Sequence, residues 1–281
     1  MEKSIGTARR ARGIFLLRSF SGPLAAILVS FLVLSGCWTT TSSEPEVDPI
    51  ALAGAIRDLG LDQLRQGNYS MAIRKLQRAE LKNPEDPLVY YGLGEAFRRK
   101  GLLAEAEVNL LKSLELSPDP HAQSYQLAVL TLSVLYIQEE RYEEAVVLCQ
   151  VLIDDPTYER PWTALTNRGW AQYKSEQFEA ARVSYQEALG YRSTYAVAHF
   201  NLGILEQERG RWLDAVRQLD LAAKSREMSS EARSEAYFRL GEIYMTLGRK
   251  DEAIEKFGLA IEKAPDGEWA EKSRSRLEVL L

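Results

Sequence analysis

The sequence predicts an all-α solenoid of six helical hairpins in series, because three residue types recur with one period. A glycine or serine recurs at Gly60, Gly94, Ser133, Gly169, Gly203 and Gly241. An alanine follows each of them by 12 residues, at Ala72, Ala106, Ala145, Ala181, Ala215 and Ala253. A larger residue follows four positions later, at Leu76, Leu110, Cys149, Tyr185, Leu219 and Phe257. Small residues at the first two positions let two antiparallel helices of one hairpin approach closely.

The spacing sets the expected repeat boundaries. Two steps of the period are 34 residues, whereas the others are 39, 36 and 38, which indicates insertions near 121–125, 160–161 and 230–233. The expected repeats are 53–86, 87–120, 126–159, 162–195, 196–229 and 234–267. The charged segment 268–281, which carries Trp269, is expected to form a capping helix, since such arrays need a solvated end.

Each repeat contains signals for two helices. In the second repeat Tyr90, Leu93 and Phe97 are spaced as one apolar stripe on a first helix. Second helices are expected to start with a residue that fills the seam, as at Tyr69, Leu103, Tyr142, Phe178 and Trp212. Prolines then stop the second helix in three repeats, at Pro84, Pro118 and Pro265.

These residues resemble the tetratricopeptide repeat, which implies a right-handed superhelical solenoid. The resemblance covers 53–267, with departures at Ser133, where glycine is usual, and at Arg168, where leucine is usual. We expect the superhelix to be irregular near the three insertions.

The N-terminus has a different character from the repeats. Residues 1–37 hold five basic residues and one acidic residue, so they carry +4 of the net charge of −5 and leave −9 for residues 38–281. An apolar run of eleven residues, 24–34, follows the basic stretch. As a helix this run would span about 17 Å, well short of a bilayer core of roughly 30 Å. Residues 1–36 are therefore expected to be a signal peptide, with an unprocessed membrane anchor as the alternative.

The run ends in Leu34-Ser35-Gly36-Cys37, which resembles the lipobox of bacterial lipoproteins. The resemblance implies that Cys37 becomes the lipidated N-terminus, carrying acyl chains such as palmitate. Residues 37–52 would then be the lipidated cysteine and a flexible tether. Trp38 stands where aspartate favours retention in the inner membrane, so the resemblance implies an outer-membrane protein facing the periplasm.

The sequence contains no pattern typical of an enzyme, and no metal or cofactor is expected. With two cysteines and two histidines, the chain has few candidate ligands or nucleophiles. Cys149 occupies a core position of a second helix, and neither His121 nor His199 has a visible catalytic partner. The negative net charge also argues against nucleic acid as the main partner.

We expect a protein partner in a concave groove lined by the first helices. The candidate groove residues are Tyr91, Glu95, Arg98, Leu130, Val134, Ile137, Trp170, Tyr173, Phe200, Ile204, Phe238 and Met245. Their apolar and aromatic character suits an amphipathic helix or an extended apolar peptide. The alternative is that several of them pack against neighbouring helices, because a register error of one residue exchanges groove and core.

A lipobox, a short tether and six repeats together resemble the pilotin lipoproteins of type IV pilus biogenesis. That resemblance implies a secretin subunit as the partner and a role in secretin assembly. Two alternatives remain open: a lipoprotein subunit of the outer-membrane protein assembly machine, and an adaptor for peptidoglycan or polysaccharide enzymes.

Overall fold

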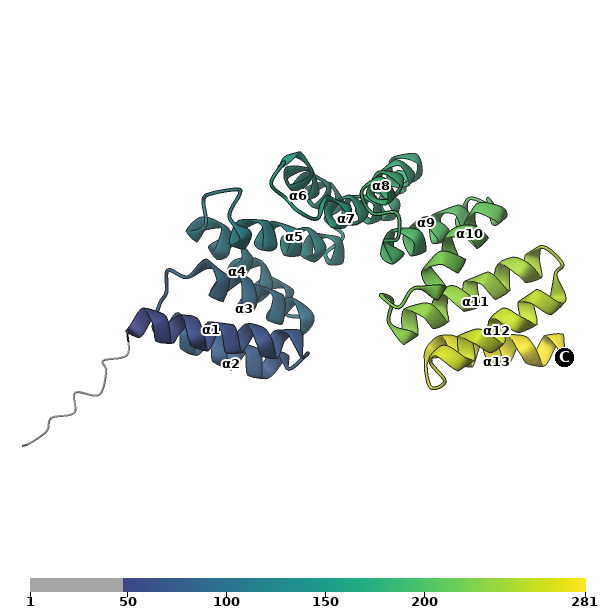
Figure 1. Cartoon of the computed structure of the whole chain (residues 1–281), viewed down its shortest axis with the longest axis horizontal. Helices are drawn as coiled ribbons and strands as arrows, with labels where there is room; N and C mark the ends of the chain where they lie inside the picture. The colour runs from purple at the N-terminus through teal and green to yellow at the C-terminus, as the bar shows by residue number, and fades with distance from the viewer. Residues whose placement is uncertain (1–47) are drawn as a thin grey trace, which may run out of the picture. The chain divides into compact units, whose positions relative to one another are not determined.

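The computed structural model describes residues 48–281, and over that range every regular element is an α-helix (Figure 1). The helices are α1 (Pro49–Arg65), α2 (Tyr69–Glu80), α3 (Pro87–Arg99), α4 (Leu103–Leu116), α5 (Gln123–Gln138), α6 (Tyr142–Asp154), α7 (Pro161–Lys174), α8 (Phe178–Tyr191), α9 (Ala196–Glu208), α10 (Trp212–Lys224), α11 (Ser230–Thr246), α12 (Lys250–Lys263) and α13 (Glu268–Leu280). The signal peptide and the lipidated cysteine lie outside the described residues.

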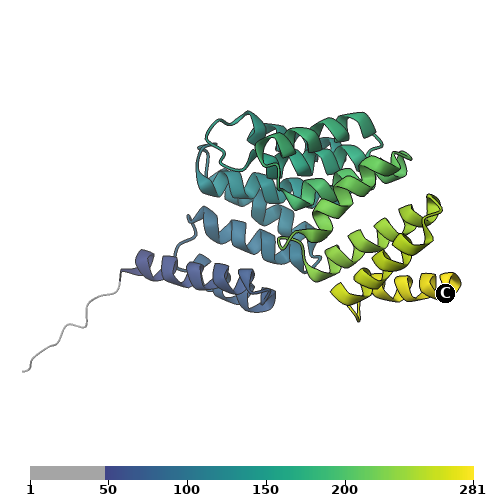
Figure 2. The same cartoon turned by 45° about the vertical axis from the view of Figure 1, so that its right-hand side comes forward.

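The helices form six hairpins, and α13 packs against α11 and α12 as the terminal cap. Successive hairpins follow an arc, which is visible from two directions (Figures 1 and 2). The all-α superhelical solenoid expected from the periodicity is therefore confirmed. Within residues 48–281 no helix is long and apolar enough to cross a bilayer.

The helix bounds show where the insertions go. Helices α5 and α11 contain 16 and 17 residues and begin at Gln123 and Ser230, inside segments that the periodicity treats as insertions. The extra residues therefore extend the first helix of a repeat. Helix α1 likewise begins at Pro49, four residues before the expected start of the first repeat, because Asp48 caps it by accepting a hydrogen bond from the Ile50 amide at 3.0 Å.

The recurring small and large residues meet at the centre of each hairpin. A Cβ atom built on Gly94 would lie 2.6 Å from Leu110, and one on Gly241 would lie 2.5 Å from Phe257. The other three glycines of the series face their partners at 2.6 to 2.8 Å in the same way. All six large residues are fully buried. Glycine is thus required by the approach of the opposite side chain.

The third repeat satisfies the same constraint with different residues. Ser133 has a Cβ atom where the other repeats have none, and it faces Cys149, which is smaller than leucine, tyrosine or phenylalanine. Its hydroxyl donates to the Leu130 carbonyl at 2.7 Å, so the buried polar group is satisfied. The volume that Ser133 adds on α5 is matched by the smaller volume of Cys149 on α6.

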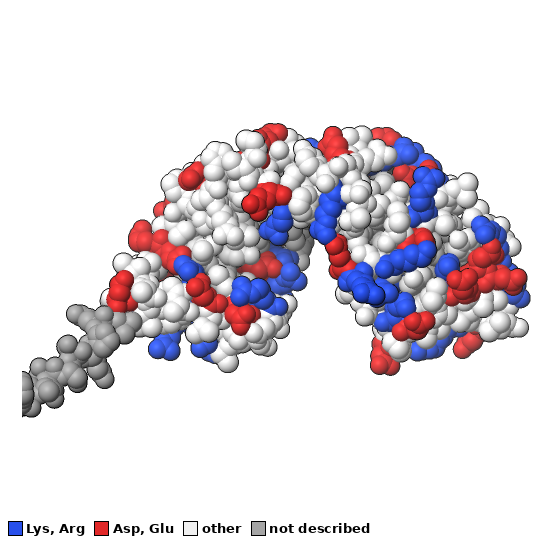
Figure 3. All heavy atoms as spheres, viewed as in Figure 1, with Lys and Arg blue, Asp and Glu red and all other residues white. Residues whose placement is uncertain are grey.

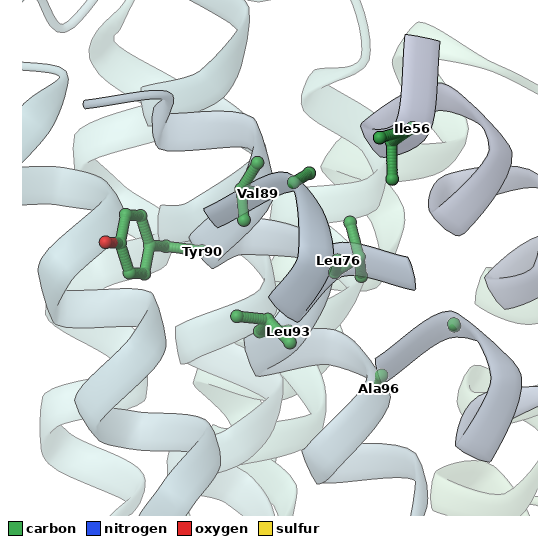
Figure 4. Close-up of a cluster of buried hydrophobic side chains, with 8 residues drawn as sticks. Ile56, Leu76, Val89, Tyr90, Leu93 and Ala96 are labelled. Atoms are coloured by element: carbon green, nitrogen blue, oxygen red, sulfur yellow. The ribbon is translucent and has the colours of Figure 1, made fainter. Parts of the chain in front are cut away.

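The core is divided into small clusters along the arc. In the first cluster Leu76 of α2 packs together with Ile56 of α1 and Val89 of α3 (Figure 4). Each cluster joins residues of neighbouring hairpins, so the stability of one repeat depends on contact with the next.

We expect Cys149→Leu to lower the free energy of unfolding by about 1–3 kcal/mol, because leucine overpacks the space opposite Ser133. Adding Ser133→Gly should recover most of that loss, as measured by urea denaturation. Gly203→Ser provides the mirror control, since it should destabilise the fifth repeat until Leu219→Cys is added. A Cys149→Leu variant as stable as the parent protein would contradict this account of the pair.

Candidate functional site

The first helices of the repeats form the inner side of the arc. Helix α3 contacts α1 and α5, α7 contacts α5 and α9, and α13 contacts α11. Among the described residues no pair of successive second helices makes comparable contact, so the second helices diverge on the outer side. We call the surface presented by α1, α3, α5, α7, α9 and α11 the inner face. Figure 3 shows the hollow of the arc that this face borders.

All twelve expected groove residues lie on these first helices, but their exposure differs. Arg98 is 9% exposed and Ile204 is 4% exposed, so both are buried. The others are half-buried: Tyr91, Glu95, Leu130, Val134, Ile137, Trp170, Tyr173, Phe200, Phe238 and Met245. A partner on the inner face therefore meets the partly exposed edges of side chains that also contact their neighbours.

The α3 end of the inner face is charged. Arg98 donates to both oxygens of Glu95, at 2.7 and 2.8 Å, and a third hydrogen bond of 3.1 Å reaches Gln138 of α5. Arg99 also donates to Glu95 at 2.7 Å. Burial raises the pKa of the neighbouring Tyr91, and the Glu95 carboxylate raises it further. Arg98 therefore connects two repeats, because its guanidinium donates both to Glu95 on its own helix and to Gln138 on α5.

The middle of the inner face is apolar. Helix α5 has no charged residue between its ends. Its Leu130 packs against the buried cluster that includes Cys149, and Ile137 packs against the cluster around Leu135. Val134 lies between them along the helix and is half-buried. This stretch offers apolar contact area without ion pairs.

An aromatic pair follows on α7. The rings of Trp170 and Tyr173 stack with centroids 5.0 Å apart, and Lys174 places its ammonium 5.9 Å from the Trp170 ring. The Tyr173 hydroxyl donates a hydrogen bond to Glu208 of α9. Burial and then this hydrogen bond raise the pKa of Tyr173, so the phenol stays protonated. The pair is an amphipathic surface held in place by a link to the next repeat.

The C-terminal part of the expected groove is largely covered. Phe238 lies 5.7 Å from Phe257 and 5.2 Å from Trp269 of the capping helix, measured between ring centroids. Phe200 packs against the buried cluster that includes Tyr237 and Leu240. These two aromatics contribute to the core at this end, as Leu130 and Ile137 do on α5. What sets α5 and α7 apart is an uncharged helix followed by a stacked aromatic pair.

Two polar networks were not expected from the sequence. Arg168 of α7 donates to Gln150 of α6 at 2.8 Å and to Ser184 of α8 at 2.9 Å. Glu206 of α9 is 2% exposed and lies within 2.9 Å of Arg182 and 2.6 Å of Arg211. The sequence marks Arg168 by its place where leucine is usual, whereas the repeat period gives no comparable sign of Glu206, because glutamine also occupies the equivalent position at Gln63 and Gln172.

The insertion at 121–125 is held in place by the carboxylate of Asp155, a half-buried residue. Asp155 accepts hydrogen bonds from the Thr157 hydroxyl at 2.7 Å and from Gln126 at 2.8 Å, and it lies 3.0 Å from Nδ1 of His121. The Thr157 hydroxyl is the main cause that holds the pKa of Asp155 down at about 2. His121 and Gln126 also line a polar cavity of about 270 Å³ beside Arg160.

The thiol of Cys149 and the imidazole of His199 are both enclosed by the packed helices. Cys149 is fully buried, and burial raises the pKa of its thiol to about 11. His199 is buried between Gln218 at 2.6 Å and the Ser193 carbonyl at 2.9 Å. No group of three or more potential metal ligands comes together among residues 48–281.

A sequence model of the tetratricopeptide repeat matches residues 57–120, 166–227 and 200–268, which together make up more than half of the chain. The chain belongs to the tetratricopeptide repeat family. The part left unmatched between 120 and 166 contains the third repeat, where Ser133 replaces glycine. Proteins with tetratricopeptide repeats are generally scaffolds that bind other proteins and do not catalyse reactions.

Solved structures show the same fold at low sequence identity. PilW, described as a widely conserved type IV pilus biogenesis factor, is 18% identical with a TM-score of 0.68, over 79% of this chain and 97% of PilW. PilF of Pseudomonas aeruginosa is 16% identical with a TM-score of 0.65, over 81% of this chain and 99% of that one. Cut9 in complex with Hcn1 is 16% identical with a TM-score of 0.66, but the match covers 42% of that chain.

Two longer proteins match through their repeats. Superkiller complex protein 3 of Mus musculus is 31% identical over 94 residues, which cover 34% of this chain and 6% of the mouse protein. Tetratricopeptide repeat protein 16 of Homo sapiens is 24% identical over 152 residues, which cover 52% of this chain and 17% of the human protein. The chain therefore spans a small fraction of these relatives.

Asp155 should stabilise the protein at neutral pH and lose this effect in acid. Its pKa of about 2 in the folded protein lies below the value of about 3.9 for an unfolded chain, so its contribution is complete above pH 4 and disappears as the pH falls toward 2. We expect Asp155→Asn to lower the melting temperature at pH 7 and the difference from the parent protein to shrink between pH 4 and pH 2. Asp154→Asn is the matched control, and an equal effect there would contradict the assignment to Asp155.

Trp170 should behave as a surface aromatic in denaturation experiments. Trp170→Ala removes a stacked pair and part of the burial of a half-buried indole, so it is expected to cost about 1–2 kcal/mol of unfolding free energy. Phe257→Ala, at a fully buried site, should cost about 3–5 kcal/mol. Similar losses for the two variants would place Trp170 in the core and remove it from the candidate binding surface.

Proposed function

We propose that this protein is a periplasmic scaffold anchored to the outer membrane, and that it acts as a pilotin promoting secretin assembly for type IV pilus biogenesis. The observation that carries the proposal is the extent of the match to PilW, which the repeat array covers almost from end to end. At 18% identity this likeness shows the fold alone. The proposed function therefore rests on two features together: the repeats match nearly the whole length of PilW, and a lipobox precedes them.

The lipid anchor is the first part of the proposal. Processing at Cys37 would leave an N-terminus with two or three acyl chains, and each buried methylene contributes about 0.8 kcal/mol to membrane binding. One chain would be marginal, whereas two or three hold the protein at the bilayer. The array would then face the periplasm beside a membrane-embedded partner.

The inner face supplies the binding surface in this proposal. The uncharged α5 and the Trp170–Tyr173 stack offer apolar area near the middle of the arc. The Glu95–Arg98 cluster on one side and the Tyr173–Glu208 link on the other are polar borders. A segment of a secretin subunit with a central apolar stretch and polar flanks would match this order, and binding it would keep the segment from aggregating before assembly.

The direct test is secretin assembly in cells that lack the gene. We expect the deletion to abolish heat-stable secretin multimers and surface pili, and the wild-type gene to restore both. Trp170→Ala should fail to restore them although the protein accumulates, while Val147→Ala, at an exposed position of the outer helix α6, should restore them. Normal multimers and pili in the deletion strain would overturn the proposal, and capture of the barrel-insertion subunit would favour the assembly-machine alternative.

The anchor is tested separately by Cys37→Ser. The variant should keep the helical circular dichroism signal of the parent protein but lack acyl chains by mass spectrometry and no longer be held in the outer-membrane fraction as a lipoprotein. Outer-membrane retention equal to that of the parent protein, without lipid, would contradict the anchor.

A further inference from the structure

The outer surface of α2 differs from that of every other second helix in the described chain. It carries Met71, Arg74, Arg78 and Leu81 at spacings of three, four and three residues, which places them along one side of the helix. Lys82 follows directly. Met71 is 40% exposed and Leu81 is 87% exposed, and both arginines are exposed. The helix therefore presents a stripe in which basic and apolar side chains alternate.

The charge of this stripe is not neutralised by its surroundings. None of Arg74, Arg78 and Lys82 forms an ion pair with a carboxylate of the described residues, whereas exposed arginines such as Arg65, Arg249 and Arg276 do. The one acidic residue of α2, Glu80, lies beside the Tyr90 hydroxyl of α3. Burial raises the pKa of Tyr90, and the Glu80 carboxylate raises it further. Figure 3 shows basic side chains along the edge of the first hairpin.

The corresponding helices of the other repeats do not share this pattern. Helix α2 has three basic residues and one acidic residue, whereas α6 has three acidic residues and no basic one. At the position of Arg74 the next three repeats carry Val108, Val147 and Val183, and the fifth carries Arg217, which lies 3.7 Å from Asp214. The basic stripe is thus a property of the first repeat, within a chain whose net charge is negative.

The position of the stripe in the chain supplies a second argument. Helices α1 and α2 are joined by only three residues and pack along each other as an antiparallel hairpin, so the C-terminal end of α2 lies toward the beginning of α1. Leu81 and Lys82 are at that end. Only residues 38–48 separate Cys37 from Pro49, and such a segment spans at most about 40 Å. A lipid on Cys37 would therefore keep the stripe close to the bilayer at a high effective concentration.

We infer that the outer face of α2 docks on an anionic phospholipid surface, with Arg74, Arg78 and Lys82 at the headgroup phosphates and Met71 and Leu81 in the interface. This inference rests on the lipid anchor of the proposed function. Basic residues near an anionic surface are attracted within about one Debye length, and exposed apolar side chains between them add contact with the interface. The contact holds the outer side of the first repeat at the membrane and leaves the inner face free for a protein.

The test uses the full lipidated chain reconstituted in vesicles. Gln77→Cys on α2 provides a labelling site, since Gln77 is exposed whereas Cys149 is buried and Cys37 would carry lipid. A fluorophore there should be quenched by headgroup-labelled lipid in vesicles with 30% phosphatidylglycerol and at least threefold less in pure phosphatidylcholine. The quenching should disappear in 0.5 M salt. The same label at Gln186 of α8 should not respond.

Charge reversal separates docking from simple attachment. Arg74→Glu with Arg78→Glu should reduce the quenching at least threefold, while Arg217→Glu with Lys224→Glu on α10 should leave it unchanged. Equal quenching in neutral vesicles, or in the α2 reversal variant, would overturn the inference. If mass spectrometry shows Cys37 without lipid, the anchor fails, yet docking remains measurable with excess vesicles by the same dependence on anionic lipid and on α2.

Discussion

The close approach of two helices at one small residue is the contact on which the rest of this structure depends. In each hairpin a glycine, or Ser133 in the third repeat, faces a fully buried side chain of the second helix. A side chain at the glycine would require the two helices to separate or the buried group to shift. Because this contact sets the geometry of each hairpin, it also sets how the hairpins stack, and the stacking forms the arc.

The inner face is a consequence of that stacking. From α1 to α9 successive first helices contact one another along the inside, which leaves their side chains half-buried and brings polar groups of adjacent repeats within hydrogen-bonding distance. Arg98 with Gln138 and Tyr173 with Glu208 both join a residue of one first helix to the following first helix. Side chains that periodicity alone assigns to a ligand therefore have a second role in holding the repeats together, and the apolar surface open to a partner includes the uncharged α5 and the stacked aromatic pair of α7.

The repeat fold could be predicted from the sequence because its determining contact uses two residue types at a constant spacing. The site could be predicted only as far as the choice of helices. The burial of Arg98 and Ile204 depends on how closely adjacent first helices approach, and the covering of Phe238 by Trp269 depends on where α13 docks. Neither the approach of adjacent first helices nor the docking position of α13 follows from the spacing of the repeats. The ion pairs of Glu206 join residues from α8 to the start of α10, and a single repeat contains no sign of them.

If the inner face is the binding surface, a protein partner should contact it near α5 and α7 and should not contact the outer face of the same repeats. Photo-crosslinking in intact cells, with the photoreactive residue placed at Val134 or Trp170 and, as controls, at Val147 or Val183 on the outer helices, measures this most directly. We expect one dominant crosslinked protein from both inner positions and none from the outer ones. Crosslinks to that protein from Val147 and Val183, with none from Val134 and Trp170, would contradict it.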